Sequence, residues 1–156
     1  MYIDLFAGCG GLSLGLWKSG WTGLFAVERN EDAFSTLHQN LEVDRHHFQW
    51  PEWLPQTHLD IYDLLKNYQN ELIGLRGQVQ LLVGGPPCQG FSMAGKRTGN
   101  DVRNRLYNSY TKFVEMVQPE MLFFENVHGF TVGFERKYKG KETKGEAYSQ
   151  KLVKRL

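Results

Sequence analysis

Cys88 is the residue of this sequence best suited to covalent chemistry. It lies in the segment G-G-P-P-C-Q-G-F-S at 84–92, directly after an apolar run at 79–83 that predicts a buried strand. Two prolines restrict the backbone before the cysteine, and the flanking glycines leave room for a substrate. A thiolate at such a strand end is a strong nucleophile when nearby positive charge lowers its pKa. The alternative is an incidental small apolar residue, although a core position fits this loop poorly.

A Gly-rich turn and two acids indicate a nucleoside site. The turn A-G-C-G-G at 7–11 joins a predicted strand to a predicted helix, and Glu28 ends the next predicted strand 18 residues after Gly10. A carboxylate there can accept hydrogen bonds from both hydroxyls of a ribose. Ser13 stands where G-x-G-x-x-G would have its third glycine, which favours a single nucleoside over a dinucleotide. Asp60 follows a further extended stretch. Its carboxylate could either bind an adenine amino group or cap the helix that follows, and the sequence favours neither role over the other.

Glu125 is the fourth candidate, directly after the apolar run 121–124. Desolvation beside such a strand would raise the pKa of its carboxyl and make it a proton donor near neutral pH. An ordinary strand-terminating acid is the alternative. No histidine is placed to serve Cys88 as the base of a protease.

These residues need a sheet whose strands all end at one edge. Strands and helices alternate along the chain without hairpin signals, which predicts parallel βαβ units and an α/β, Rossmann-like, doubly wound, mainly parallel sheet. Ligands in such sheets bind at the carboxyl ends of the strands. The predicted strands lie at 2–6, 24–27, 79–83 and 121–124, the helices at 12–20, 31–40, 64–73, 106–117 and from 146, and the loops at 43–56 and 88–103.

Length and composition exclude several other classes. The chain has 156 residues, of which 41% are apolar and 22% charged, as in one globular domain. No apolar run approaches the ~20 residues of a membrane span, and no signal peptide is visible at the N-terminus. The two cysteines, Cys9 and Cys88, are too few for a disulfide framework or a cysteine-based zinc site. We therefore expect no metal, no membrane and a cytoplasmic, reducing environment.

The charge is distributed unevenly along the chain. Residues 1–134 carry 10 Lys/Arg against 14 Asp/Glu, and residues 135–156 carry 8 against 3, so the net charges are −4 and +5. A basic end on an acidic body is typical of a protein with a polyanionic partner. A solvated loop followed by a surface helix is the alternative.

Four motifs together resemble the DNA cytosine-5 methyltransferase family. They are D-L-F-A-G-C-G-G at 4–11, V-E-R-N at 27–30, G-G-P-P-C-Q-G-F-S at 84–92 and F-F-E-N-V at 123–127, and the resemblance runs from Tyr2 to about Phe130. It implies S-adenosylmethionine as cofactor, S-adenosylhomocysteine as product, double-stranded DNA as substrate, and a methyltransferase fold that is incomplete at the C-terminus.

The resemblance also implies a role for each matching residue. Cys88 would add to C6 of a flipped cytosine, Glu125 would engage the ring at N3, and C5 would then take the methyl group. The motif residue Asn126 and the loop 89–104 would lie at the substrate. Gln89 and Ser92 lie near the start of that loop. The residues implied at the cofactor are Phe6, Gly8, Gly10, Glu28, Asp60, Pro86 and Leu106.

Other parts of the family are absent from the sequence. There is no Gln-Arg-x-Arg motif, no target recognition domain and no C-terminal Gly-Asn-Ser helix. We therefore expect residues 1–134 to be the cofactor-binding and catalytic part, and residues 135–156 to be a basic linker and the start of a helix. A missing C-terminal half or a second chain would complete the enzyme, and the isolated chain would be inactive.

Three alternatives remain open at this point. The chain could be a non-catalytic scaffold half, a tRNA cytosine-5 methyltransferase of the same family, or a nucleotide-binding dehydrogenase. The dehydrogenase reading leaves P-P-C-Q at 86–89 unexplained. By analogy, a compact chain that starts at the first motif looks like a bacterial restriction-modification enzyme in the cytoplasm.

Overall fold

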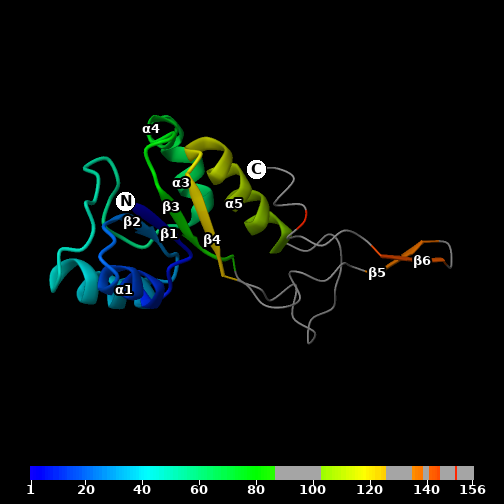
Figure 1. Cartoon of the computed structure of the whole chain (residues 1–156). Coiled ribbons are helices and arrows are strands. Elements are labelled where there is room, and N and C mark those ends of the chain that lie inside the picture. Colours follow the sequence, from blue (N-terminus) through cyan, green and yellow to red (C-terminus); the bar gives the residue numbers. More distant parts are fainter. Residues whose placement is uncertain (87–102, 126–134, 139–140, 145–149, 151–156) are drawn as a thin grey trace.

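A four-stranded parallel sheet forms the centre of the protein (Figure 1). The computed structural model describes residues 1–86, 103–125, 135–138, 141–144 and 150. The strand order is β2-β1-β3-β4, and every neighbouring pair is parallel. The predicted parallel α/β sheet is therefore confirmed. The strands are β1 (Tyr2–Leu5), β2 (Gly23–Val27), β3 (Leu81–Gly84) and β4 (Met121–Phe124).

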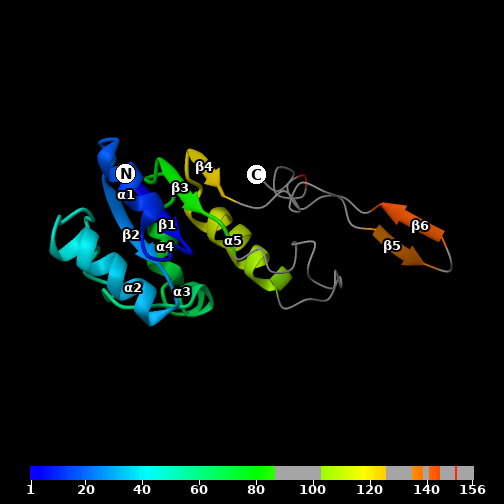
Figure 2. The same cartoon turned by 90° about the horizontal axis from the view of Figure 1, so that it is seen from below.

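Helices cover both faces of this sheet (Figures 1 and 2). Alternate residues of β1 enter two different cores, as the two-residue period of a strand requires. Ile3 and Leu5 pack in the core that α3, α4 and α5 cover, whereas Tyr2 packs in the other core, with α2 and η1. The sheet is thus doubly wound. The helices are α1 (Gly11–Lys18), α2 (Glu31–Leu37), the π-helix η1 (His38–Val43), α3 (Ile61–Asn67), α4 (Gln69–Gly74) and α5 (Arg103–Val117).

Two side-chain caps begin the helices that follow the binding edge. The Asn30 side chain accepts a hydrogen bond from the backbone N–H of Ala33 at 2.9 Å and caps α2. Asp60 accepts one from the N–H of Tyr62 at 2.8 Å and caps α3. Each cap satisfies a backbone donor that a helix start leaves unpaired. The predicted helix 64–73 is divided in the structure, because Tyr68 leaves helical geometry between α3 and α4.

The segment predicted as a loop at 43–56 runs beside β2. Phe48 forms an isolated parallel bridge with Gly23, and the N–H of Leu59 donates to the carbonyl of Glu28 at 2.7 Å. A Cβ at Gly23 would lie 2.3 Å from the Phe48 ring, so only glycine allows this approach. Phe48 thus lies beside the start of β2, and the hydrogen bond from Leu59 to Glu28 fixes the end of β2 directly before Asp60.

The basic end contains two strands that the sequence did not predict. β5 (Glu135–Tyr138) and β6 (Lys141–Lys144) pair antiparallel as a separate two-stranded sheet. Both views place this hairpin apart from the parallel sheet. The remaining residues of the predicted linker lie outside the described residues, apart from Gln150.

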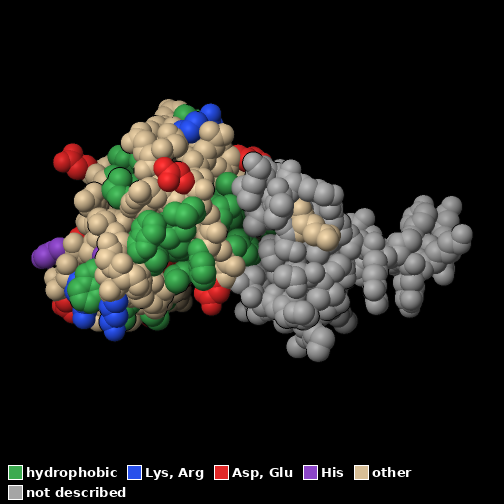
Figure 3. Space-filling view, in the orientation of Figure 1, with side chains coloured by type: hydrophobic (Ala, Val, Ile, Leu, Met, Phe, Trp, Pro, Cys, Tyr) green, Lys and Arg blue, Asp and Glu red, His purple; other side chains and the backbone are tan. Residues whose placement is uncertain are grey.

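One face of the edge strand β4 is exposed. Leu122 and Phe124 pack against the core beside α5, whereas Met121 and Phe123, which alternate with them, are 49% and 53% exposed. Figure 3 shows hydrophobic side chains gathered on this side of the molecule, over the sheet. Among the described residues, no helix is long and apolar enough to cross a membrane.

Candidate functional site

The four strands of the parallel sheet end at one edge. The register pairs Leu5 with both Val27 and Gly84, and Gly84 with Phe124. The residues that follow these strand ends, Phe6, Glu28, Gly85 and Glu125, must therefore line up along this edge. Residues far apart in the sequence are brought together as the parallel fold predicted.

Glu28 joins the first two strand ends. Its Oε2 accepts a hydrogen bond from the N–H of Gly8 at 2.9 Å, and its Oε1 accepts one from the N–H of Asn30 at 2.7 Å. A carboxylate has about four acceptor sites, so about two remain for hydroxyl donors of a ligand. Glu28 thus fixes the Gly-rich turn and keeps acceptor capacity for a ribose.

The Gly-rich turn has an unusual backbone. Phe6 has φ +60°, and Gly10 has φ +85°. A positive φ is strained for phenylalanine by roughly 1–3 kcal/mol, and such strain is typical of functional sites. A Cβ at Gly10 would lie 2.9 Å from Leu41 and 3.0 Å from Leu37, so the turn also packs tightly onto the helices below it.

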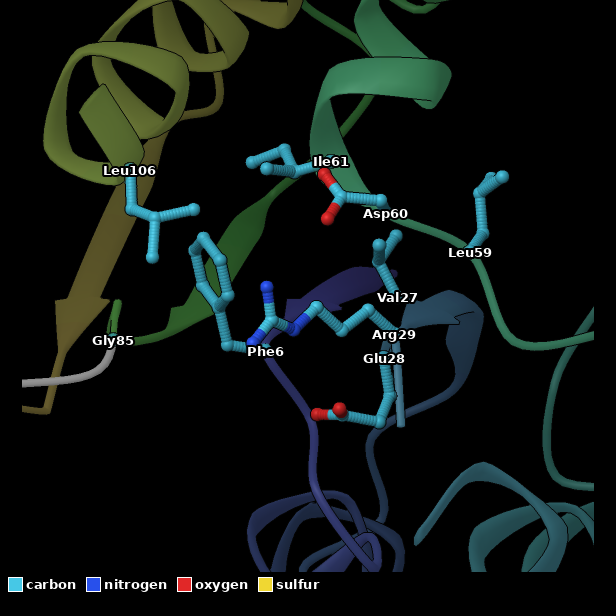
Figure 4. Close-up of a pocket in the computed structure, with 9 residues that line it drawn as sticks. All are labelled: Phe6, Val27, Glu28, Arg29, Leu59, Asp60, Ile61, Gly85 and Leu106. Carbon is cyan, nitrogen blue, oxygen red and sulfur yellow. The ribbon is translucent and has the colours of Figure 1, made fainter. Parts of the chain in front are cut away.

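A pocket of about 530 Å³, including its open mouth, lies along this edge (Figure 4). Four of the residues predicted to bind the cofactor meet there. The Phe6 ring and Leu106 form one side, and the Asp60 carboxyl extends into the pocket. A second, wider hollow continues from it past Asn30 and His58. The pocket is lined by Phe6, Val27, Glu28, Arg29, Leu59, Asp60, Ile61, Gly85 and Leu106.

The sequence prediction missed five of these lining residues, one of which, Gly85, directly precedes the predicted Pro86. Val27, Arg29, Leu59 and Ile61 are each the chain neighbour of a predicted residue, so adjacency to Glu28 or Asp60 was the available signal. Arg29 is exposed at this pocket. Asp60 caps α3, as one of its two interpretations predicted, and it also lines the pocket. Its contact with an adenine amino group stays a prediction.

The ends of β3 and β4 lie in close contact. A Cβ at Gly85 would lie only 1.7 Å from the carbonyl oxygen of Glu125, so glycine is required at this position. Pro86, the next residue, is buried. Glu125 itself is exposed, so the desolvation that the sequence led us to expect does not occur in this structure. The other predicted substrate residues, Cys88, Gln89, Ser92 and Asn126, lie outside the described residues.

Asp4 is a buried acid beneath this edge that the sequence analysis did not single out. It is 1% exposed, and its carboxylate accepts a hydrogen bond from the hydroxyl of Ser13 at 2.6 Å. Burial raises the pKa of the Asp4 carboxyl from its ordinary value to about 6, against the lowering effect of Ser13. The charges of Glu125 and Glu28 raise the pKa further. The edge is thus strongly acidic and suits a cationic ligand.

Asp4→Asn should stabilise the protein at pH 8. Because the pKa of Asp4 is higher in the folded state (about 6) than in the unfolded state (3.8), the folded protein is destabilised above pH 6 and recovers stability as the pH falls towards 4. A neutral amide removes that cost, so we expect a gain of roughly 1–3 kcal/mol in the free energy of unfolding at pH 8.

Urea denaturation between pH 8 and pH 4 measures this effect. The control is Asp32→Asn, at an exposed position in the first turn of α2. It should change stability by less than about 0.5 kcal/mol, with no transition near pH 6. An Asp4→Asn protein that is no more stable than wild type at pH 8 would contradict the prediction.

Among the described residues, no group of three or more His, Cys, Asp or Glu could hold a metal ion. The described edge offers carboxylates, apolar walls and the Gly-rich turn. These groups fit a neutral or cationic nucleoside with free ribose hydroxyls.

The fold is that of S-adenosylmethionine-dependent methyltransferases. The family model for C-5 cytosine-specific DNA methylases matches residues 1–144. The chain therefore belongs to the C-5 cytosine-specific DNA methylase family, as its motifs indicated.

Several curated proteins are similar to the chain. It is 34% identical over 137 residues to the type II methyltransferase M.XorII of Xanthomonas oryzae. The aligned region covers 87% of the chain and 30% of M.XorII. It is 38% identical over 125 residues to the type II methyltransferase M.HgiGI of Herpetosiphon aurantiacus, and the aligned region covers 80% of the chain and 88% of M.HgiGI. A crystal structure of a DNA modification methyltransferase encoded within an Escherichia coli prophage matches with a TM-score of 0.59 and 31% identity, over 99% of the chain and 37% of that protein. The chain spans less than a third of the length of M.XorII.

Members of this family take their methyl group from S-adenosylmethionine, and the site fits this molecule. Its adenosine needs an apolar slot and acceptors for the ribose hydroxyls, for which Phe6, Leu106 and Glu28 are suited. Its sulfonium gives it a net positive charge, which matches the acids along the edge. The carboxylate acceptors and the apolar walls thus agree with the cofactor of the family.

Proposed function

We propose that the protein transfers the methyl group of S-adenosylmethionine to C5 of cytosine in DNA. The observation that carries the proposal is the acidic pocket at the carboxyl ends of the parallel sheet, next to the segment that leads to Cys88. Bound there, S-adenosylmethionine would supply an electrophilic methyl group. The names of the relatives and the family of the chain support the same reaction.

Each residue predicted to bind the cofactor, in the pocket or beside it, would have a distinct role. Glu28 would accept hydrogen bonds from both ribose hydroxyls, and Asp60 would accept one from the adenine amino group. Phe6 and Leu106 would enclose the base. Gly8 and Gly10 would let the backbone approach the methionine part, and Pro86 would lie near the sulfonium.

Cys88 and Glu125 would perform the chemistry on the base. The thiolate of Cys88 would add to C6 while Glu125 engages N3, so that C5 becomes nucleophilic and takes the methyl group. Loss of the C5 proton would then expel the thiolate and restore the ring. Because C6 is stacked inside duplex DNA, the cytosine must first be flipped out, at a cost of a few kcal/mol. The segment around Gln89, Ser92 and Asn126 would contact the flipped base.

Two measurements test this function. Isothermal titration calorimetry with S-adenosylmethionine and with NAD should give binding of the first alone, which separates a methyltransferase from a dehydrogenase. Transfer of a labelled methyl group to duplex DNA by the chain together with its completing segment, followed by nucleoside analysis, should give 5-methylcytosine. Transfer to tRNA but not to DNA would assign the chain to the RNA-modifying branch, and label at adenine would overturn the proposal.

The exposed face of β4 supports the proposal that a partner segment packs on it. This segment would be either the remainder of the same enzyme or a second chain. Met121 and Phe123 are large apolar side chains at the sheet edge, and exposed apolar edge strands are usually covered. The greater length of M.XorII is consistent with such a segment. A location in the bacterial cytoplasm, where the DNA lies, accompanies this proposal.

Replacing both exposed residues, as Met121→Thr and Phe123→Thr, should impair assembly more than stability. Since both are about half exposed, we expect less than about 1 kcal/mol of change in the free energy of unfolding of the chain alone. When the chain is co-expressed with the completing segment, methylation of host DNA should fall at least about tenfold, measured by cleavage with a methylation-sensitive restriction enzyme. Ile73→Ser, at a 41% exposed position on α4, is the control. Unchanged methylation would exclude β4 as the docking surface.

A further inference from the structure

A single buried side chain joins α1 to the sheet. Of the eight residues of α1, all of which the structure describes, only Ser13 is buried, and it is 0% exposed. The leucines of the helix, Leu12, Leu14 and Leu16, are only partly buried against the core. A surface helix is usually held by an apolar stripe that faces the core. The contact of Ser13 with the sheet therefore matters more here than in a typical amphipathic helix.

Ser13 donates its hydroxyl hydrogen to the carboxylate of Asp4 across 2.6 Å. Asp4 lies in the middle of β1, between Ala26 of β2 and Val83 of β3, and is 1% exposed. A hydrogen bond from a hydroxyl to a carboxylate is short and about twice as strong as one between neutral groups. This bond closes a loop, residues 4–13, that contains the whole Gly-rich turn 7–11. The pair thus fixes the two ends of the turn relative to each other.

The Gly-rich turn has few other anchors among the described residues. Its backbone donates to the sheet edge from Ala7 to the carbonyl of Val27 at 3.0 Å, and from Gly8 to Glu28 at 2.9 Å. The N-cap of α1 is a glycine, so the helix start has no side-chain cap. A strained backbone, as at Phe6, keeps its conformation only where the surrounding structure holds it. The turn therefore depends on the pair beneath it.

Asp4 lowers the stability of the fold at this position. The other residues of β1, Tyr2, Ile3 and Leu5, are all buried and counted with the apolar core. The raised pKa of the Asp4 carboxyl shows that its negative charge is unfavourable in the fold. An apolar residue would fill the place without this cost. A group that lowers stability beneath a binding site is often retained for function.

We propose that the Asp4–Ser13 pair holds the Gly-rich turn in the conformation that receives the methionine part of S-adenosylmethionine. This inference rests on the function proposed above and adds two positioning residues to it. Neither side chain lines the pocket, so the pair acts on the cofactor through the backbone of Gly8 and Gly10. Without the pair the turn would populate other conformations, and the apparent affinity would fall in proportion to the population of the binding form.

A double variant, Asp4→Leu with Ser13→Ala, tests this role. It removes both partners of the bond, so neither is left buried alone, and such a change is nearly neutral for stability. The affinity for S-adenosylmethionine should fall at least about tenfold, which corresponds to a binding form populated about one tenth of the time. Adenosine lacks the methionine part, and Phe6, Glu28 and Leu106 are unchanged, so its affinity should stay within about twofold. Calorimetry measures both, and Ser13→Ala alone should show the same split.

Two further variants separate positioning from stability. Asp4→Asn keeps an oxygen that can accept from the Ser13 hydroxyl, so its affinity for S-adenosylmethionine should stay within about threefold of wild type. Thr111→Val removes another fully buried hydroxyl, which donates to the carbonyl of Tyr107 at 2.7 Å inside α5. Because α5 packs in the other core from α1, this control should leave the ratio of the two affinities unchanged.

Amide hydrogen exchange tests the turn without any ligand. The N–H groups of Gly10 and Leu14 donate to the carbonyls of Ala7 and Gly10 at 3.0 and 2.8 Å. In the double variant both groups should exchange at least about tenfold faster than in wild type. The N–H of Phe34, which bonds to the carbonyl of Asn30 at the start of α2, should exchange at its wild-type rate.

Each outcome bears on the proposal. Wild-type affinity for S-adenosylmethionine in the double variant, or an equal loss for the two ligands, would overturn the positioning role. Absence of S-adenosylmethionine binding by wild-type protein would instead overturn the proposed function. The exchange rates of Gly10 and Leu14 would then decide whether the pair holds the turn, and unchanged rates at both would overturn that role.

Discussion

Cys88→Ala is expected to abolish methyl transfer and to leave the binding of S-adenosylmethionine within about twofold of wild type. Without a thiolate the cytosine ring is not activated at C5, and loss of a covalent nucleophile typically costs at least about 10³-fold in rate. The pocket proposed to bind the cofactor is lined by other residues, so binding should persist. Single-turnover transfer of labelled methyl groups in the presence of the completing segment measures the first quantity, and calorimetry measures the second.

Cys9→Ala is the matched control for the nucleophile. Cys9 is the other of the two cysteines of the chain, and it is exposed in the Gly-rich turn. We expect the Cys9→Ala protein to retain methyl-transfer activity within about threefold of wild type. If the Cys88→Ala protein still transferred methyl groups at the wild-type rate, the covalent mechanism would be excluded.

Glu28→Gln is expected to weaken the binding of S-adenosylmethionine by roughly 30- to 100-fold. The Glu28 carboxylate accepts from the N–H groups of both Gly8 and Asn30. An amide has only one oxygen, so its NH₂ group must face one of these donors, and the ribose loses an acceptor as well. An unmade hydrogen bond of this kind costs about 2–2.7 kcal/mol, which corresponds to that loss of affinity.

Calorimetry with the cofactor measures this loss, and Glu52→Gln is its control. Glu52 is an exposed acid on the segment that runs beside β2, away from the pocket lining. It removes the same charge, so it reports any general electrostatic effect. Equal affinities for the two variants would refute a direct role of Glu28 in binding the ribose.

The part of the site that depends on strand ends was predictable from the sequence. Glu28 and Asp60 follow apolar or extended stretches, and parallel strands necessarily end at one edge. The cap at Asn30 was predictable for a similar reason, because the residue type and the acids that follow it form a local signal.

Features that arise from tertiary packing were not predictable. Asp4 lies inside an apolar strand, and only the fold shows that it is buried and bonded to Ser13, nine residues later. The break at Tyr68 interrupts a regular apolar pattern, so the periodicity indicated one helix where there are two. The hairpin of β5 and β6 has charged strands joined by Lys139-Gly140, which lacks the Asn-Gly or Asp-Gly that marks most tight hairpins.

The two backbone hydrogen bonds of Glu28 have a consequence for selectivity between sugars. With two of its roughly four acceptor sites already occupied, the carboxylate matches a sugar that has two vicinal hydroxyls. A 2′-deoxyribose would leave one of the remaining sites without a donor, at a cost of roughly 1–3 kcal/mol. The pocket would thus discriminate against the deoxyadenosine units of DNA, the proposed substrate, and against free deoxynucleotides.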